Sequence, residues 1–396
     1  MQKTFDEVVL FARTGLNPRQ NFKLGQGNNY YITIKNIKNN SLVIDDNTDV
    51  VNDEAIKLIH KRSQIKKGDI LFASIGRMGD MYIIEEEPMA WDINESVFAF
   101  TLDTSIVRQK YFYYIFRVKS TLDYLESNSS GSTFKSIKMN QLKKMKFEIP
   151  ALDKQDQIVS VLDKICNVIE MRKQELGSLD DLIKARFVEM FGDLANPECS
   201  WDKCKFVDAC ADKDDIKCGP FGTQLSKDEY TTSGIAVWEI PQINTAFLSE
   251  PTHFLTEEKA EQLNSYTIIP GDIAMSRKGN VGKCALFPND YPDGIIHSDV
   301  LRIRVDRERL NPAFMVCQLH FSGFVTRQIE LVSSGAIMAG VNVTKLKQIY
   351  VHVPPMDLQN QFADFVRQVD KSKVAVQKAL DETQTLFDSL MQEYFG

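Results

Sequence analysis

Long apolar runs and low-complexity tracts are both absent from this 396-residue sequence. Nowhere do eighteen apolar residues follow one another, and the first ten residues carry two acids and no apolar core, so we expect neither a membrane span nor a signal peptide. No Pro-, Gly- or Ser-rich tract interrupts the chain, which argues against extended disorder. A chain of this length exceeds one ordinary domain, so these absences favour a tandem of folded domains.

Matched cysteine pairs are also missing. Seven cysteines is an odd number, and without a signal peptide they indicate reduced thiols and a cytoplasmic protein. Four of them lie close together, but their spacing lacks the second C-x₂₋₄-C pair of a structural zinc site, so we expect no metal; they are Cys199, Cys204, Cys210 and Cys218.

The charge balance leaves nucleic-acid binding open. The formal net charge is −7, and only residues 1–150 carry more Lys and Arg than Asp and Glu. Because binding depends on cations clustered on one face, the net charge of a whole domain does not decide the matter.

Catalytic signatures are missing as well. The sequence has no Asn-Pro-Pro-Tyr or Asp-Pro-Pro-Tyr motif of amino-methyltransferases and no glycine-rich cofactor loop. Gly282-Lys283-Cys284 lacks both the upstream glycine and the Ser or Thr of a Walker A loop. We therefore expect a protein that is not an enzyme and that holds no cofactor of its own.

What the sequence does contain is an internal repeat with a shift of about 204 residues. Four blocks align in the same order: Lys67-Gly68-Asp69-Ile70 with Pro270-Gly271-Asp272-Ile273, Ser129-Ser130-Gly131 with Ser333-Ser334-Gly335, Ile149-Pro150 with Val353-Pro354, and Phe191-Gly192 with Phe395-Gly396. Four ordered blocks at nearly one shift indicate two half-molecules with a shared architecture.

Each half divides at its proline. Before it lie short β-branched and aromatic runs broken by Gly, Asn and Asp, and after it lies a long helical pattern. The first stripe has intervals of 3, 4 or 7 and contains Ile158, Leu162, Ile165, Ile169, Leu176, Leu179, Ile183, Phe187 and Met190; the second is weaker. A helix of about 35 to 40 residues spans roughly 50 to 60 Å, longer than a small domain is wide, so we expect the two helices to pack against each other rather than each on its own domain.

These features predict an α+β fold with a pseudo-two-fold internal duplication: two mixed α/β globules separated by two long, antiparallel, coiled-coil-like helices. The expected segments are a first globule over 1–150, a first helix over 151–195, a second globule over 196–355 and a second helix over 356–396. A purely structural adaptor whose globules bind protein would fit the same pattern.

The repeated motif resembles specificity (S) subunits of type I restriction-modification systems over the whole chain. The resemblance is carried by residues 149–158 (IPALDKQDQI) and 353–362 (VPPMDLQNQF), the two Gly-Asp-Ile segments and residues 219–223 (GPFGT). It implies that each globule is a target-recognition domain for one half of a split, asymmetric site on double-stranded DNA. It also implies that the helices dock two methyltransferase (M) subunits and that restriction (R) subunits complete the complex, so that S-adenosylmethionine, ATP and Mg belong to these partners. An antiparallel helix pair fits this expectation, because it relates two globules as the subunits of a dimeric reader are related.

Candidate DNA contacts come from loops in each half. We expect phosphate contacts from Arg77, and from Arg277, Lys278, Asn280 and Lys283, because neighbouring glycines let a backbone approach closely; an ordinary hairpin turn would show the same glycines. Candidate base readers supply Arg, Asn, Gln and neighbouring polar groups, although ordinary polar loops also contain them: Asn17, Arg19, Asn21, Lys23, Lys35, Asn36, Thr223, Gln224, Gln242 and Asn244. A third group offers hydroxyls and charge, or else forms a solvated linker: Ser130, Thr133, Lys135, Lys138 and Ser334.

Overall fold

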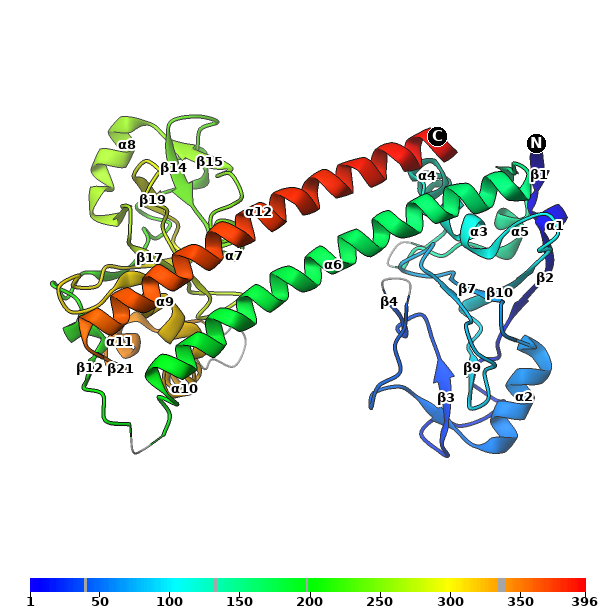
Figure 1. The fold of residues 1–396 in the computed structure, drawn as a ribbon, viewed down its shortest axis with the longest axis horizontal. Helices are drawn as coiled ribbons and strands as arrows, with labels where there is room; N and C mark the ends of the chain where they lie inside the picture. The colour runs from blue at the N-terminus through cyan, green and yellow to red at the C-terminus, as the bar shows by residue number, and fades with distance from the viewer. Residues whose placement is uncertain (39–40, 132–133, 197–198, 334–339) are drawn as a thin grey trace. The chain divides into compact units, whose positions relative to one another are not determined.

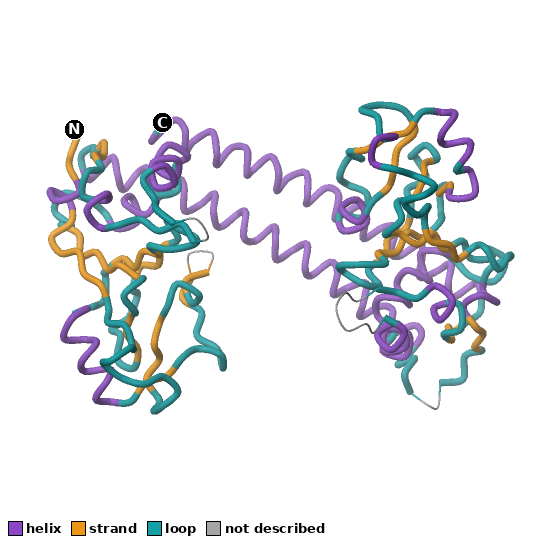
Figure 2. The backbone as a smooth tube through the Cα atoms, turned by 180° about the vertical axis from the view of Figure 1, so that it is seen from behind, coloured by secondary structure: helices purple, strands orange, loops and turns teal. Residues whose placement is uncertain are grey.

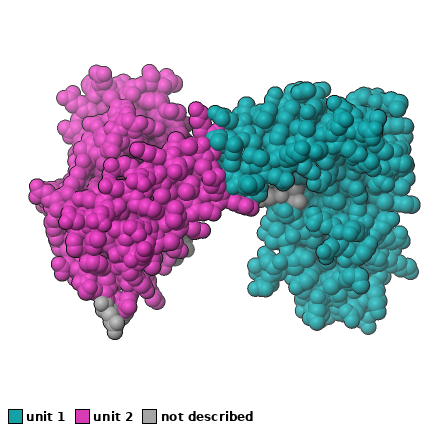
Figure 3. Space-filling model, in the orientation of Figure 1, with its two compact units in different colours: residues 1–172, 379–396 teal, residues 173–378 magenta. Residues whose placement is uncertain are grey.

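The computed structural model describes residues 1–38, 41–131, 134–196, 199–333 and 340–396. The chain divides into two compact units, shown in different colours in Figure 3. Unit 1 comprises Met1–Arg172 together with Ala379–Gly396, and unit 2 comprises Lys173–Lys378. Each unit therefore contains one globule and parts of both long helices. Within the described ranges, no helix is both long and apolar enough to cross a membrane.

The main sheet of unit 1 is antiparallel, with the strand order β2-β10-β7-β8. Its strands are β2 (Val9–Thr14), β7 (Ile70–Ala73), β8 (Met81–Ile83) and β10 (Val97–Leu102). The buried rings of Phe72 and Phe100 pack on one another and on Phe5 and Phe112, which come from short helices. These helices are α1 (Phe5–Val8), α3 (Gln109–Ile115), α4 (Lys119–Ser127) and α5 (Met139–Leu142).

A second sheet in unit 1 has the order β6-β3-β9 and contains a parallel pair, β3 with β9. Its strands are β3 (Asn29–Ile32), β6 (Val50–Val51) and β9 (Trp91–Ile93), and helix α2 (Asp53–Ser63) packs beside them (Figure 1). Two-stranded ribbons complete the globule: β1 (Gln2–Thr4) with β11 (Lys146–Glu148), and β4 (Ile37–Lys38) with β5 (Ser41–Leu42).

Unit 2 repeats this topology. Its main sheet has the order β13-β20-β17-β18, the ribbon β12-β21 corresponds to β1-β11, and β14 pairs in parallel with β19 in the sheet β15-β14-β19-β16. Figure 1 labels several of these strands, and Figure 2 shows the strands in orange. The strands are β12 (Lys203–Lys205), β13 (Ile216–Cys218), β14 (Ile235–Trp238), β15 (His253–Leu255), β16 (Thr267–Ile268), β17 (Ile273–Ser276), β18 (Cys284–Leu286), β19 (Gly294–Ile296), β20 (Val300–Ile303) and β21 (Tyr350–His352). The helices are α7 (Ile240–Asn244), α8 (Glu257–Gln262), α9 (Pro312–Phe321), α10 (Gly323–Val332) and α11 (Val343–Leu346), with 3₁₀ turns η1 (Phe206–Ala209), η2 (Lys227–Glu229) and η3 (Asn264–Tyr266). The predicted internal duplication is confirmed.

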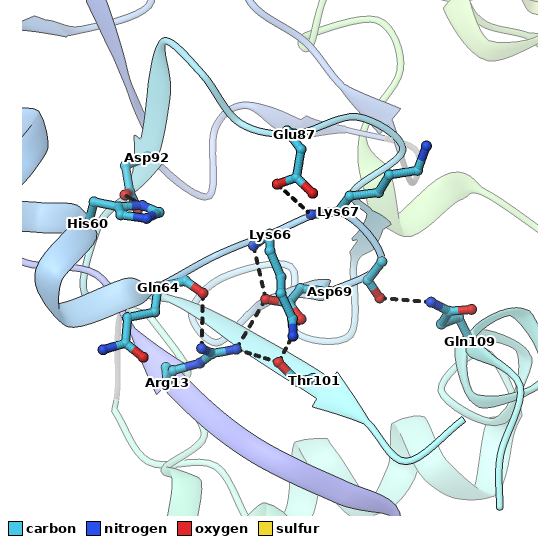
Figure 4. Close-up of polar contacts among 11 residues, drawn as sticks. Arg13, His60, Gln64, Lys66, Lys67, Asp69, Glu87, Asp92, Thr101 and Gln109 are labelled. Atoms are coloured by element: carbon cyan, nitrogen blue, oxygen red, sulfur yellow. Dashed lines mark hydrogen bonds and ion pairs between the residues drawn. The ribbon is translucent and has the colours of Figure 1, made fainter. Parts of the chain in front are cut away.

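The repeated Gly-Asp-Ile motif places a buried aspartate before a central strand. In unit 1, Asp69 accepts hydrogen bonds from Arg13 Nη2 (3.1 Å) and Thr101 Oγ1 (2.6 Å) (Figure 4), and burial raises the pKa of its carboxyl group. In unit 2, Asp272 accepts two from Arg304, at 2.7 Å each. Arg304 stands where unit 1 has Thr101, so the arginine partner comes from a different strand in each half. The motif thus needs a paired aspartate but not one fixed partner position.

Two 40-residue helices follow the two globular segments: α6 (Leu152–Phe191) and α12 (Met356–Phe395). In unit 1 they run antiparallel: Lys154 of α6 lies over the Tyr394 ring, whereas Arg172 donates to the Ala379 carbonyl of α12. In unit 2 the Phe187 ring contacts that of Phe362, with 5.6 Å between centroids. The helix pairing follows from the predicted stripe, of which Ile158, Leu162, Ile169, Ile183 and Phe187 are buried.

One glutamine holds each long helix to its globule. Gln155 is fully buried, accepts from the Arg108 amide (2.8 Å) and donates to the carbonyls of Ile106 (2.9 Å) and Pro150 (2.8 Å). Its repeat partner Gln359 makes the same three kinds of bond, to Asn311, Arg309 and Pro354. These contacts explain why both halves place glutamine at the fourth residue of the helix.

Candidate nucleic-acid interface

A glycine-containing hairpin leaves the end of the central strand in each main sheet. In unit 1 it joins β7 to β8, and Gly76 and Gly79 have φ angles of 72° and 95°. In unit 2 it joins β17 to β18, and Gly279 and Gly282 have φ angles of 69° and 83°. These left-handed conformations favour glycine, so the hairpin reading of the motif holds. Cationic side chains flank the glycines at both hairpins.

Arg77 links its hairpin to strand β4. Its Nη2 donates to the Ile37 carbonyl (2.8 Å), and its Nε lies 3.3 Å from an oxygen of Asp80. Burial raises the pKa of the Asp80 carboxyl group, while the charges of Arg77 and Arg117 act to lower it. The Arg77 side chain remains 54% exposed, so its guanidinium can still meet an anion from solvent.

Lys135 and Ser136 lie against the same hairpin. The Gly76 amide donates to the Lys135 carbonyl (3.0 Å), and Ile75 forms a bridge with Ser136. The Lys135 ammonium pairs with Glu126, whereas Lys138 and Ser130 are exposed. Thr133 lies outside the described residues. Lys135, predicted as a phosphate contact from a separate segment, therefore lies at the same hairpin as Arg77.

Residues 14–23 leave the same end of the sheet, because β2 ends at Thr14, which pairs with Phe98 at the start of β10. The Tyr31 hydroxyl donates to the Leu16 carbonyl (2.6 Å) and fixes the start of this segment. Asn21 donates to the Asn17 carbonyl (2.9 Å), so its amide shapes the loop. Exposed at the surface are Arg19 and Lys23, and neither forms an ion pair with a described residue.

In unit 2, the β17-β18 hairpin also contacts segments that are distant in the sequence. The Arg277 guanidinium lies 5.4 Å from the centre of the Phe221 ring, in the segment that follows β13. The Val341 amide donates to the Arg277 carbonyl (3.0 Å), which brings the chain after the second Ser-Ser-Gly motif to the hairpin. Lys278 pairs with Asp299 at 2.7 Å. Three segments far apart in the sequence thus meet at one end of the main sheet of unit 2. In unit 1 the hairpin contacts Lys135 and Ser136, and residues 14–23 leave from the same end of the sheet.

The C-terminal end of α7 also contacts the β17-β18 hairpin. Lys283 donates to the Asn244 carbonyl (2.9 Å), and Asn280 Nδ2 donates to the Asn244 side chain (3.3 Å). Thr223 and Gln224 are exposed, although the side-chain oxygen Oε1 of Gln224 already accepts from the Tyr266 hydroxyl (2.9 Å). Ser334 lies outside the described residues.

The sequence of this chain matches a known protein family in both halves. The family described as the type I restriction modification DNA specificity domain matches this chain over residues 2–180 and again over 221–383, once for each half. This chain belongs to the type I restriction-modification specificity subunit family. Subunits of this family supply DNA sequence specificity.

Individual relatives of this specificity subunit agree. The type I restriction enzyme MjaIX specificity subunit of Methanocaldococcus jannaschii is 22% identical over 297 residues, which cover 72% of this chain and 68% of the relative. A putative type I restriction enzyme specificity subunit of Haemophilus influenzae, S.HindORF215P, is 33% identical over 104 residues, or 26% of each chain.

Solved structures show the same fold. The S subunit of a type I restriction-modification system from M. genitalium aligns with a TM-score of 0.57 and 15% identity, covering 100% of this chain and 96% of that one. A chain from a structural study of complex assembly and conformational transition of the type I R-M system aligns with a TM-score of 0.54 and 14% identity, covering 99% and 96%. The predicted α+β architecture of this specificity subunit is thereby confirmed.

Two predicted base readers of the specificity subunit are buried instead of exposed. Asn36 accepts from the Thr33 amide (2.9 Å) and donates to the Val43 carbonyl (3.0 Å). Gln242 accepts from the Glu239 amide (3.2 Å) and donates to the Glu250 carbonyl (2.9 Å). Asn36 serves main-chain groups at a turn and Gln242 does so at the N-terminus of α7, which leaves no free amide edge for a base. Of the two other residues predicted with them, Lys35 is exposed and Asn244 is half-buried.

Sequence reasoning missed the partners that orient the cations. Phe221 is 51% exposed and carries Arg277 on its ring, while Asp80, Asp299 and Glu126 each pair with a predicted phosphate contact. Asp80 is close in sequence to its partner and could have been found by a three-residue spacing, but Asp299 is brought in by β20. Among the described residues, no group of three or more His, Cys, Asp or Glu is arranged to hold a metal ion.

Proposed function

We propose that this specificity subunit reads a bipartite, asymmetric site on double-stranded DNA, with one half-site for each globule. The observation that carries the proposal is the equivalent placement of three loop segments at one end of each main sheet, with cations at both and different side chains around them. Equivalent frameworks with unlike side chains are what two unequal half-sites require, since base edges are read by individual side chains.

The two kinds of contact fall to different residues. Arg77 in the first globule, and Arg277, Lys278 and Lys283 in the second, bind phosphates from the glycine hairpins and set the position of the DNA. Arg19, with the neighbouring polar loop, contacts base edges in the first half-site, and Thr223 and Gln224 do so in the second. An arginine already held by a carboxylate or an aromatic ring is pre-oriented, so it loses less side-chain entropy on binding.

The chain itself supplies recognition and no catalytic group. Two methyltransferase subunits dock on the long helices and modify an adenine in each half-site, and restriction subunits add translocation and cleavage. S-adenosylmethionine, ATP and Mg are held by those partners. Base modification within a duplex needs extrusion of the target base, which is the task of the methyltransferase and not of the reader.

The test is to co-express the chain with its methyltransferase and to map methylated adenines by single-molecule sequencing. We expect one split, asymmetric motif. Because phosphate contacts carry no sequence information, Arg77→Ala with Arg277→Ala lowers methylation of that same motif, whereas Arg19→Ala relaxes one half of it only. The matched control is Lys146→Ala with Lys205→Ala, two exposed cations on the β1-β11 and β12-β21 ribbons, which leaves methylation unchanged.

An adaptor that binds only protein gives a different result. Methylation at a continuous motif, or methylation that persists without this chain, contradicts the reader function. Binding that does not weaken as salt rises also contradicts it, since phosphate contacts release counterions.

A further inference from the structure

Helix α2 of unit 1 presents a cationic surface outside the cluster described above. Its N-terminus is capped by Asn52, and its buried face consists of Ala55, Ile59 and Ser63. The opposite face carries Lys57 and Lys61, whereas Arg62 lies beside the buried face; all three are exposed, and we call these three residues the α2 cationic surface. Lys57 and Lys61 are four residues apart and therefore lie on one side of the helix.

These cations are not used in the fold as ion-pair partners. Within the described parts of the chain, none of the three forms a salt bridge. The acids of the helix lie in its first turn, where Asp53 accepts a hydrogen bond from Asn29 (2.8 Å). Like charges at i and i+4 destabilise a helix by a few tenths of a kcal/mol, so the ammonium groups of Lys57 and Lys61 repel one another. The helix dipole favours Lys61 and Arg62 in the last turn but not Lys57.

The equivalent helix of unit 2 carries the opposite charge. Helix α8 is likewise capped at residue 256 by a side chain that accepts from the amide three residues on. Its exposed residues are Glu257, Glu258 and Glu261, and its one lysine, Lys259, pairs with Glu229 at 2.6 Å. The same position in the duplicated fold is therefore cationic in one half and acidic in the other.

The α2 cationic surface adjoins the segment to which we assign base reading. Arg62 Nη2 donates to Thr14 Oγ1 (3.3 Å), the residue at which residues 14–23 leave the sheet. That segment adds the exposed Arg19 and Lys23. Cations on α2 thus extend the positive charge of the reading segment instead of forming an isolated patch.

We propose that the α2 cationic surface binds phosphates of the DNA next to the half-site read by the first globule, and that the second globule has no such contact. The two half-sites are then held unequally: the first depends more steeply on salt than the second. This inference rests on the DNA-reading function proposed above and adds a partner surface to it.

The experiment uses the complex of the full chain with its methyltransferase and a duplex containing the mapped motif. Binding is measured by fluorescence anisotropy between 50 and 200 mM salt for the wild type and for Lys57→Gln with Lys61→Gln. Each lost phosphate contact lowers the magnitude of the slope of log K against log salt by about 0.9, so the slope of the double variant is smaller by about 1.8. The ratio of the wild-type binding constant to that of the variant therefore decreases roughly twelvefold between 50 and 200 mM salt. The methylated motif stays the same.

Two matched variants isolate the effect. Lys146→Gln with Lys205→Gln removes the same net charge elsewhere and leaves the slope unchanged. Glu257→Gln with Glu261→Gln alters the equivalent helix of unit 2 and also leaves it unchanged. Neutral methylphosphonate linkages beside the half-site that Arg19→Ala relaxes should lower the wild-type slope but not that of the α2 variant.

The two proposals fail in different ways. A wild type with a split motif and steep salt dependence, together with an α2 variant of unchanged slope, overturns the α2 contact and leaves the reader function intact. A wild type without sequence preference overturns the reader function itself. An equal loss from the Lys146 and Lys205 control would mean that net charge, and not the α2 cationic surface, governs binding.

Discussion

Replacing Gln155 by leucine keeps the size of the side chain and removes the buried hydrogen bonds that this residue makes between the start of α6 and its globule. The side chain is 0% exposed, and it satisfies the Arg108 amide and the carbonyls of Ile106 and Pro150. In the variant these three main-chain groups stay buried without that partner. We therefore expect unit 1 to lose stability while the leucine gains little, because the site is lined by polar main-chain atoms.

The size of the loss follows from the number of groups left unpaired. A buried donor or acceptor without a partner costs about 1 to 3 kcal/mol, so three of them cost at least about 3 kcal/mol. This is a large share of the roughly 5 to 15 kcal/mol that stabilises a typical domain. Gln359→Leu should have the same effect on unit 2, since it makes the same three bonds.

Hydrogen exchange followed by mass spectrometry separates the two units, which a single unfolding curve of a two-unit chain does not. For Gln155→Leu we expect peptides from α3 and β11 to exchange about a hundredfold faster, because each 1.4 kcal/mol is a factor of ten, whereas peptides from the unit 2 sheet stay unchanged. The control is Gln157→Leu, two residues further along α6 and exposed, which should change stability by less than about 0.5 kcal/mol.

A Gln155→Leu variant no less stable than Gln157→Leu would refute this reasoning. So would a variant that weakened unit 2 as strongly as unit 1. Either result would mean that the three hydrogen bonds do not hold the helix to its own globule.

Two further predictions concern buried polar groups of unit 2. Asp272→Asn breaks the paired contact with Arg304 and should lower the stability of unit 2 by roughly 3 kcal/mol, measured by hydrogen exchange of peptides from its main sheet; a loss below about 1 kcal/mol would contradict a stabilising ion pair. His352 is fully buried, and burial lowers its pKa from 6.5 to about 4. Because the unfolded chain binds the His352 proton more tightly than the folded chain, the free energy of unfolding decreases as the pH falls. The decrease begins near pH 6.5 and reaches up to about 3 kcal/mol below pH 4. His352→Phe should remove that part of the pH dependence, and an unaltered profile would contradict it.

The long helices and the duplication were predictable because their signals are local or exactly repeated. The expected first and second helices begin at 151 and 356, and the structure begins them at Leu152 and Met356. A proline before each start and an apolar stripe of helical period act over a few residues, so no distant contact is needed to recognise them. The glycine hairpins were predictable for the same reason, since their positive φ angles favour glycine.

The candidate site was predictable only in part. The loop segments at one end of each main sheet were selected from the sequence, but their placement there depends on the order β2-β10-β7-β8 and its counterpart, which joins strands far apart in the chain. Asn36 and Gln242 were predicted to be base readers because of their side-chain type, and the tertiary structure instead buries Asn36 at a turn and Gln242 at the start of α7. The cations of α2 were not selected, because only the fold places them next to Thr14.

The sequence by itself determined the two halves, the two long helices and the places where strands turn. These depend on the intrinsic conformational preferences of glycine and proline and on periodic apolar residues, all of which act locally. Only the tertiary structure decided which polar side chains are free. A buried amide and an exposed one have the same sequence signal, and long-range packing alone supplies or withholds their hydrogen-bond partners.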